Sequence, residues 1–599
     1  MLARTLGVAL ATVVLLAAAP DEIELSDSPV ADSAEHGDGE ALRSLLREGA
    51  DVNAAQGDGM TALHWGAVRN DSRTVETLLY AGANVHATTR LAGFTAGLLA
   101  ARNGDAATLE RLLDAGADAN GATAMGASSL MLASASGNVD AVRLLLDRGA
   151  DLGAREHSGA QTALMFAAAY DRADVIELLI SAGANPGDTT DVVDAVALNT
   201  ALDEGFRKRL EDLRESRAKA AEADGPVGAQ SEDEAEAQST EKSFFSKLFG
   251  WMIPGGDDEP EPEAQRRQRE SYGVRVGAQG GMTALLLASR QGYRDSVETL
   301  LRHGADVNQV AGGSKTSPLL IATMNGHFDL ALSLLGEGAD PTFAGEPSGV
   351  TPLYAAINLA WAPRAAYPQP VAQKQQNASH LALMRALLEK GADPNIRLKK
   401  KVWFMGYNFD RSSIDEIGAT PFWRAAYGSD VAAMELLRAY GADSGIPTTK
   451  PSQRPPVASS RAQESKSEDA TAPKVGPGMS PLHGATGAGY GEGFAANDHR
   501  NHPAGFMPAV KYLVEECAAD VNAIDHDGSS PLHNAAARGD IEMIEYLVAK
   551  GADVTIVNAE GRSTADMANG PVQRVNPFPE ARDLLVSLGA VNNDNCVSC

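Results

Sequence analysis

A three-residue motif, Gly-Ala followed by Asp or Asn, recurs along this 599-residue chain at a nearly constant spacing. It begins at Gly49, Gly82, Gly116, Gly149 and Gly183, at intervals of 33, 34, 33 and 34 residues. It resumes at Gly304, Gly338, Gly391 and Gly441, degenerates to Ala518-Ala519-Asp520, returns at Gly551 and fades at Gly589. Self-similarity at this period is typical of stacked copies of one small unit. The sequence therefore predicts about twelve repeats of one unit.

Helix signals flank each triplet. A pair of leucines, such as Leu45-Leu46 or Leu300-Leu301, precedes the triplet and predicts the buried stripe of the unit's second helix. The triplet glycine predicts the end of that helix, because a residue without a Cβ adopts the left-handed conformation most cheaply. A Thr or Ser farther along predicts the cap of the next first helix, since its hydroxyl accepts a free backbone N–H and a following Pro suits the first turn. These residues are Thr61, Thr95, Ser317, Thr351, Thr420, Ser480 and Ser530.

Three helix starts carry a recognisable signature. Thr61-Ala62-Leu63-His64, Ser480-Pro481-Leu482-His483 and Ser530-Pro531-Leu532-His533 resemble the Thr-Pro-Leu-His motif of the ankyrin repeat. The resemblance implies an all-α solenoid of helix pairs joined by short β-hairpins, with a concave face that binds partners. It also implies that Thr61, His64, Ser480, His483, Ser530 and His533 are structural, the histidines bonding neighbouring turns. Ser128-Ser129-Leu130-Met131 departs from the motif, and Ser563-Thr564-Ala565-Asp566 predicts a terminal cap.

The composition between the repeats divides the chain into segments. The whole chain resembles exported bacterial proteins with many ankyrin repeats and insertions in the second half. The predicted segments are a signal peptide (1–19), a first array (20–187), a charged, partly disordered insertion with a helix over 191–221 and a short apolar helix (188–279), a second array with enlarged repeats (280–446), a disordered linker (447–477), C-terminal repeats with a cap (478–595) and a cysteine-containing tail (596–599).

The N-terminus predicts export to the periplasm or secretion. Arg4 precedes the apolar run 6–16, and Ala17-Ala18-Ala19 offers small residues for cleavage. Pro20 disfavours cleavage directly after them, so retention as an anchor stays open. The chain holds three cysteines, and disulfides are therefore not the main source of its stability.

Aromatic residues are sparse, at 5% of the chain, and they gather in the insertions. In 244–253 the residues Phe244, Phe249 and Trp251 predict a short apolar helix that docks on the solenoid, a partner protein or a membrane surface. Because aromatic residues dominate binding hot spots, further rings in the enlarged repeats predict a partner-binding surface, with coverage of a neighbouring repeat as the alternative. These are Trp361, Trp403, Phe404, Tyr407 and Phe409.

Two other groups suggest chemistry. Cys596 and Cys599 have the spacing of redox motifs, although we expect a local disulfide and place Cys517 in a buried helix. His499 and His502 lie near each other in a long connection, but no recognised metal-ligand spacing is present. We therefore expect no cofactor and no metal. An accessory redox or metal-binding protein remains the alternative function.

The net charge of −28 excludes a role in tracking nucleic-acid phosphates, which requires clustered Lys and Arg. No nucleophile elbow, phosphate loop or zinc motif was found, so the sequence predicts no enzyme. It predicts a monomeric scaffold that binds a protein partner, with membrane contact open through 244–253 or an uncleaved signal. A host-directed secreted effector is a further alternative.

Overall fold

The computed structural model describes most of the repeat regions. The described residues are 28–198, 200, 201, 205, 208, 209, 276–361, 371–402, 414, 416–449, 475–489, 501–570 and 577–593. The chain divides into two compact units. The first unit comprises Met1–Asp188 with Asp295–Ala305, and the second comprises Thr189–Arg294 with Asp306–Cys599.

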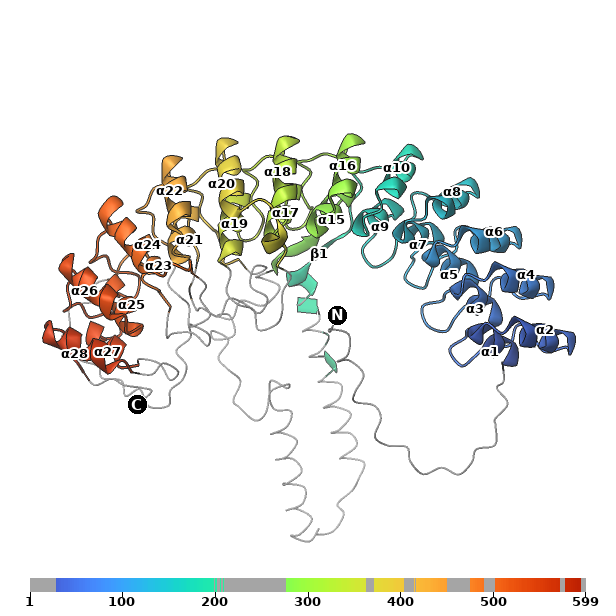
Figure 1. Cartoon of the computed structure of the whole chain (residues 1–599), viewed down its shortest axis with the longest axis horizontal. Coiled ribbons are helices and arrows are strands. Elements are labelled where there is room, and N and C mark those ends of the chain that lie inside the picture. Colours follow the sequence, from blue (N-terminus) through green and yellow to red (C-terminus); the bar gives the residue numbers. More distant parts are fainter. Residues whose placement is uncertain are drawn as a thin grey trace, which may run out of the picture. The chain divides into compact units, whose positions relative to one another are not determined.

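The first unit is built from five successive helix pairs (Figure 1). They are α1 (Pro29–His36) with α2 (Gly39–Arg47), α3 (Ala62–Val68) with α4 (Ser72–Tyr80), α5 (Ala96–Asn103) with α6 (Ala106–Asp114), α7 (Ser129–Ser136) with α8 (Val139–Asp147), and α9 (Ala163–Ala169) with α10 (Ala173–Ser181). The odd-numbered inner helices contact one another in sequence, and so do the outer helices from α4 to α10. Most of α16 (Arg294–Arg302) also belongs to this unit.

The second unit repeats the arrangement with longer connections. Its inner helices, each contacting the next, are α15 (Ala284–Gln291), α17 (Pro318–Met324), α19 (Pro352–Ala360), α21 (Pro421–Tyr427), α23 (Pro481–Ala485), α25 (Pro531–Ala537) and α27 (Thr564–Ala568). Its outer helices are α18 (Phe328–Gly336), α20 (His380–Glu389), α22 (Val431–Ala439), α24 (Met507–Lys511) with η3 (Tyr512–Glu516), α26 (Ile541–Ala549) and α28 (Pro579–Ser587). A short 3-10 helix, η1 (Ala372–Gln375), precedes α20. The mostly helical repeat fold predicted from the sequence is confirmed.

A strand pair opens the second unit, where the sequence predicts the start of a helix. β1 (Val192–Asp194) pairs antiparallel with β2 (Ala278–Gly280), and Val192 lies opposite Gly280. The prediction of a helix from residue 191 is thus wrong for these residues. The helical stripe starts later in the segment, and strands of three residues are too short to show alternation in the sequence. In the part of the chain described, no helix is both long and apolar enough to cross a membrane.

The predicted helix boundaries agree with the observed caps. The Thr95 hydroxyl accepts the Leu98 N–H at 3.2 Å, and the Ser317 hydroxyl accepts the Leu320 N–H at 3.2 Å. All triplet glycines follow a helix with φ between 81° and 107°, in the left-handed region. Ala518, in the degenerate triplet, adopts the same conformation with φ of 53°.

The degenerate triplet follows a helix with one extra residue. The Ala519 N–H bonds the Leu513 carbonyl, six residues back, whereas Ala552 bonds Leu547, five residues back. The π-helical turn η3 absorbs the additional residue. It also displaces Cys517 to the bend after the helix, where its side chain is partly exposed. The prediction that Cys517 is a buried helix residue is therefore wrong.

Asparagine side chains join successive hairpins. Asn120 donates its amide N–H to the Gly149 carbonyl at 3.2 Å and accepts the Asp151 N–H at 2.6 Å. One side chain thus satisfies two backbone groups of the next repeat, which fixes the stacking distance between hairpins. The same pair of bonds is made by Asn53, Asn308, Asn395 and Asn522.

Candidate functional site

The inner helices of the first unit carry a row of apolar side chains that solvent reaches. Trp65, Leu132 and Phe166 each follow the N-cap residue of their helix by four positions, and all three are partly buried. Leu99 occupies the same position of α5 and is 4% exposed. Because these helices contact one another in order, the four positions follow one another along the unit and form a row. We call the surface formed by α3, α5, α7, α9 and the hairpins before them the inner face.

Charge on the inner face differs from that of the whole chain. The helices α3, α5, α7 and α9 contain no Asp or Glu, although the chain has a net charge of −28. Their C-terminal ends present exposed Arg69 and Arg102, and Tyr170 with 55% of its surface exposed. The four helices of the inner face are therefore apolar and aromatic with arginines at their ends, whereas the hairpins before them carry carboxylates such as Asp58 and Asp118.

The hairpin tips continue this surface. Leu91 is 78% exposed and Met125 is 56% exposed. Successive tips are joined through their backbones: the Ala124 N–H bonds the Ala92 carbonyl at 2.8 Å, and the His157 N–H bonds the Met125 carbonyl at 2.9 Å. Leu91 and Met125 thus lie on adjacent, mutually fixed tips.

Two contacts tie the hairpins to the helices. The Trp65 indole N–H donates to Gln56 Oε1 at 2.7 Å. The Arg102 guanidinium lies 5.3 Å from the centre of the Phe94 ring, a cation–π geometry. The indole and the arginine are therefore held in place before any partner binds, which lowers the entropy lost on binding.

The buried side chain of His64 joins helix α3 to the hairpin before α5. Its Nδ1 accepts the Thr61 N–H at 3.1 Å, so the ring proton resides on Nε2, which donates to the Phe94 carbonyl at 3.0 Å. Burial of the imidazole lowers the pKa of His64 below its usual value, with the Phe94 carbonyl opposing the shift. The neutral ring therefore connects α3 to the next hairpin by hydrogen bonds at both of its nitrogens.

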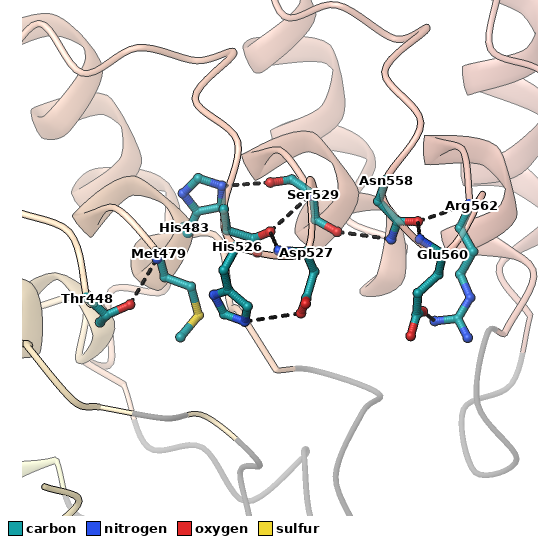
Figure 2. A network of polar contacts seen from close by, with 10 residues as sticks. Thr448, Met479, His483, His526, Asp527, Ser529, Asn558, Glu560 and Arg562 are labelled. Atoms are coloured by element: carbon teal, nitrogen blue, oxygen red, sulfur yellow. Dashed lines mark hydrogen bonds and ion pairs between the residues drawn. The ribbon is translucent and has the colours of Figure 1, made fainter. Parts of the chain in front are cut away.

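The second unit makes the same bond twice, and Figure 2 shows the first of the two, from His483 to Ser529. His483 Nε2 bonds the Ser529 carbonyl at 2.9 Å, and His533 Nε2 bonds the Arg562 carbonyl at 3.4 Å. Asn558 extends the network by donating to the Ser529 hydroxyl at 3.1 Å. Burial lowers the pKa of His533 to about 4, and it lowers the pKa of His483 against the opposing charge of Asp525.

A tryptophan takes the histidine position in α21. Trp423 follows its cap Thr420 by three residues, as His64 follows Thr61, and its indole N–H donates to the Met479 carbonyl at 2.9 Å. In each case the acceptor directly precedes the cap of the next inner helix. Sequence reasoning missed this bond, although the spacing from the cap could have revealed it.

The inner side of the second unit is filled by its own chain. Tyr354, Trp423 and Tyr427 pack in one buried hydrophobic cluster, and the Trp423 and Tyr427 rings stack with centres 5.3 Å apart. Residues of the enlarged hairpins complete the cluster, namely Leu398, Val402, Ile414 and Met479. Each residue of α21, α23, α25 and α27 is buried.

Comparison with known families agrees with this geometry. Residues 91–190 and 285–362 match ankyrin repeats (3 copies), residues 513–568 match ankyrin repeats (many copies), and residues 58–90 match a single ankyrin repeat. This is an ankyrin-repeat protein. Proteins with ankyrin repeats act as interaction scaffolds, and the matches include no catalytic domain.

Curated relatives resemble the ankyrin-repeat protein over short stretches. Alpha-latrocrustotoxin-Lt1a of Latrodectus tredecimguttatus is 41% identical over 59 residues, which are 10% of this chain and 4% of the toxin. Ankyrin repeat domain-containing protein 49 of Homo sapiens is 41% identical over 51 residues, 8% of this chain and 21% of that protein. Ankyrin repeat domain-containing protein 37 of Bos taurus is 31% identical over 91 residues, 14% of this chain and 54% of its own length. The chain thus spans about half, or much less, of these relatives.

Of the insertion residues predicted to bind a partner, Trp361 is described. Its indole N–H donates to Asp430 Oδ2 at 2.9 Å, and His380 Nε2 bonds the same oxygen at 2.7 Å. The bonds from His380 and the α22 backbone lower the pKa of Asp430 although burial opposes this. Trp361 thus bridges repeats of the ankyrin array, and its role toward a partner stays a prediction.

The remaining predicted residues fall outside the described part of the chain. They are Trp403, Phe404, Tyr407, Phe409, Phe244, Phe249, Trp251, His499, Cys596 and Cys599, together with the signal segment 1–19. His502 is described, and its ring packs edge-on against Trp361 with centres 5.7 Å apart. Among the described residues, no group of three or more His, Cys, Asp or Glu side chains could hold a metal ion.

Proposed function

We propose that this protein is a non-enzymatic scaffold that binds a protein partner through the inner face of its first unit. The observation that carries the proposal is that Trp65, Leu132 and Phe166 are partly exposed, at a helix position where Arg424 of α21 and Asn534 of α25 in the second unit are buried. Exposed apolar side chains that adjoin one another mark interaction sites more often than scattered ones do.

The distribution of aromatic residues supports this choice. Residues 28–188 contain five aromatic side chains, and four of them lie on the inner face: Trp65, Phe94, Phe166 and Tyr170. The fifth, Tyr80, ends an outer helix. Since Trp and Tyr supply large contact areas at small entropic cost, their concentration on one face favours a binding role for it.

The proposal places the binding surface away from the enlarged repeats that the sequence favours. In those repeats, the described hairpin residues Leu398, Val402 and Ile414 are 4%, 4% and 3% exposed and pack on the unit's own helices. Apolar surface already covered by the chain contributes nothing further to binding. Trp403, Phe404, Tyr407 and Phe409 remain a second predicted surface.

Affinity capture with matched variants tests the proposal. Full-length protein, the triple variant Trp65→Ala, Phe166→Ala, Tyr170→Ala and the control Tyr80→Ala are immobilised and exposed to extract of the source cells. The triple variant is expected to lose the proteins that wild type and control both retain, with its far-UV circular dichroism unchanged. Equal capture by all three proteins contradicts the assignment of the inner face.

We further propose that the chain is exported and acts in the periplasm or outside the cell. The support is the apolar run 6–16 with its small-residue segment Ala17–Ala19. Intact-mass measurement of protein recovered from the periplasmic fraction tests this. Loss of about twenty N-terminal residues is expected, whereas full-length protein found only in the cytoplasm contradicts export.

A further inference from the structure

Two arginines on the outer side of the first unit form ion pairs between successive repeats. Arg111 forms an ion pair with Glu76 at 3.2 Å, and Arg148 forms one with Asp114 at 2.8 Å, in both cases between neighbouring outer helices. Each of α2, α4, α6, α8 and α10 carries at least one Asp or Glu. The outer helices thus carry acidic residues, two of which pair with arginines.

Three arginines of the inner face lack such partners, whereas Arg155, in the hairpin before α9, pairs with Asp188 at 3.5 Å. Among the described residues, no ion pair joins Arg69, Arg90 or Arg102 to a carboxylate, and all three are exposed. Arg69 donates one N–H to the Glu35 carbonyl at 3.0 Å, and the Arg102 guanidinium lies over the Phe94 ring. A guanidinium carries five N–H donors, so each of these arginines keeps donors for a ligand.

Nearby carboxylates are occupied by the backbone. Asp71 accepts the N–H groups of Arg73 and Thr74 at the start of α4, and these bonds together with the charge of Arg69 lower its pKa although burial opposes this. Asp58 accepts the Met60 N–H at 2.9 Å within its hairpin. Neither carboxylate forms an ion pair with an arginine of the inner face in the described residues.

The apolar row lies between these arginines. Along α5 and its hairpin, Arg90 precedes the row position Leu99, and Arg102 follows it. A ligand that covers Trp65, Leu132 and Phe166 therefore meets arginines on the hairpin side and on the helix-end side. Carboxylates suit both positions, because the guanidinium fork matches their geometry.

We propose that the inner face of the first unit binds a partner segment that combines an apolar stripe with flanking Asp or Glu side chains. This inference rests on the proposed function, since it names the chemistry of the partner for the same face. It runs against the net charge of the whole chain, which on its own favours basic ligands.

Two synthetic peptides test the inference with the full-length protein. Both have the same length and the same Leu and Phe positions; one carries Glu and the other Lys at the polar positions. Fluorescence anisotropy at low and moderate salt is expected to show that the Glu peptide binds several-fold more tightly, with a preference that shrinks as salt screens the charges. A preference for the Lys peptide overturns the inference.

Arginine variants localise the effect. The double variant Arg90→Ala, Arg102→Ala is expected to weaken binding of the Glu peptide about fivefold, as two exposed ion pairs would. The matched control Arg111→Ala, Arg148→Ala removes two outer arginines and is expected to leave affinity unchanged. Equal effects of both double variants overturn the inference.

The aromatic triple variant separates this inference from the proposed function. If both peptides bind alike and both lose affinity in Trp65→Ala, Phe166→Ala, Tyr170→Ala, the inner face is a binding surface and the acidic chemistry is wrong. If the triple variant binds the Glu peptide as wild type does, the proposed binding face is itself wrong.

Discussion

The two units differ in the exposure of the position that lies four residues after the cap of each inner helix. Trp65, Leu132 and Phe166 hold this position in the first unit and are partly exposed, whereas Arg424 and Met567 hold it in the second unit and are 1% and 3% exposed.

The two inner-helix tryptophans follow this difference. Trp65, four residues after its cap, is partly exposed and its indole bonds a hairpin glutamine, whereas Trp423, three residues after its cap like the buried His64, is 0% exposed and stacks on Tyr427. The helices that carry them have the same caps and nearly the same length. Hairpins of the second unit add to this covering, since they return Leu398, Val402 and Ile414 onto the helices. The two units of this ankyrin array thus differ in how far the described chain itself covers the inner helices.

Truncating the two tryptophans gives the largest expected contrast. Trp423→Ala leaves a cavity in a closed cluster and should lower the free energy of unfolding of the second unit by about 3 to 5 kcal/mol. Trp65→Ala removes a partly exposed side chain and should cost the first unit about 1 kcal/mol or less. Hydrogen-exchange mass spectrometry reads each unit separately, and similar losses in both would contradict the contrast.

Acid should weaken the second unit more than the first. A histidine whose folded pKa is depressed stabilises the fold above its unfolded pKa, and this contribution disappears as pH falls toward the folded pKa. For His533 the window runs from 6.5 down to about 4, which corresponds to about 3 kcal/mol. His483 adds to the effect in the same direction, and the first unit has only His64 among the motif histidines.

Urea unfolding at several pH values between 7 and 4 measures this effect. The variant His533→Asn should be less stable at neutral pH and should lose less stability on acidification than wild type does. An unchanged pH dependence in this variant would show that the buried imidazole is not the acid-sensitive group.

Removing only the buried indole bond should have a smaller effect. Trp423→Phe keeps an aromatic ring but removes one of the two bonds to the Met479 carbonyl, which still accepts the Thr448 N–H at 3.0 Å, at an expected cost of about 1 kcal/mol to the second unit. Trp65→Phe removes a bond to the partly exposed Gln56, which water can replace, and should cost the first unit less than about 0.5 kcal/mol. Denaturant midpoints of the two variants decide between these outcomes.

The smallest expected effect concerns the degenerate triplet of the second unit. Ala518 has φ of 53°, in a region that disfavours a Cβ, so Ala518→Gly should stabilise the adjacent helix by about 0.5 kcal/mol. The reverse change in the regular triplet, Gly551→Ala, should destabilise by about 1 kcal/mol. Thermal unfolding of the pair is expected to shift in opposite directions, and a destabilising Ala518→Gly would contradict the explanation.

Local signals made most of the fold predictable. Ser480 caps the start of its own helix, and Gly551 ends the helix before it. A few neighbouring residues are therefore enough to predict both helix termini. The contacts that decide which face is open are not local. The Trp361 indole bonds Asp430, 69 residues away, and Trp423 bonds Met479, 56 residues away. An aromatic residue can belong to a core or to a binding surface, and composition does not distinguish the two. The sequence therefore favours the enlarged repeats as the binding surface because aromatic residues gather there.

Hydroxyl-radical footprinting of the full-length protein tests the central contrast most directly. The method measures how quickly each aromatic or sulfur-containing side chain is oxidised in solution, without a ligand. We predict fast oxidation of Met125 and Tyr170, measurable oxidation of Trp65 and Phe166, and strong protection of Trp423 and Tyr427. Protection of the first group, or oxidation of Trp423 at a rate similar to that of Trp65, would contradict an open inner face in the first unit and a closed one in the second.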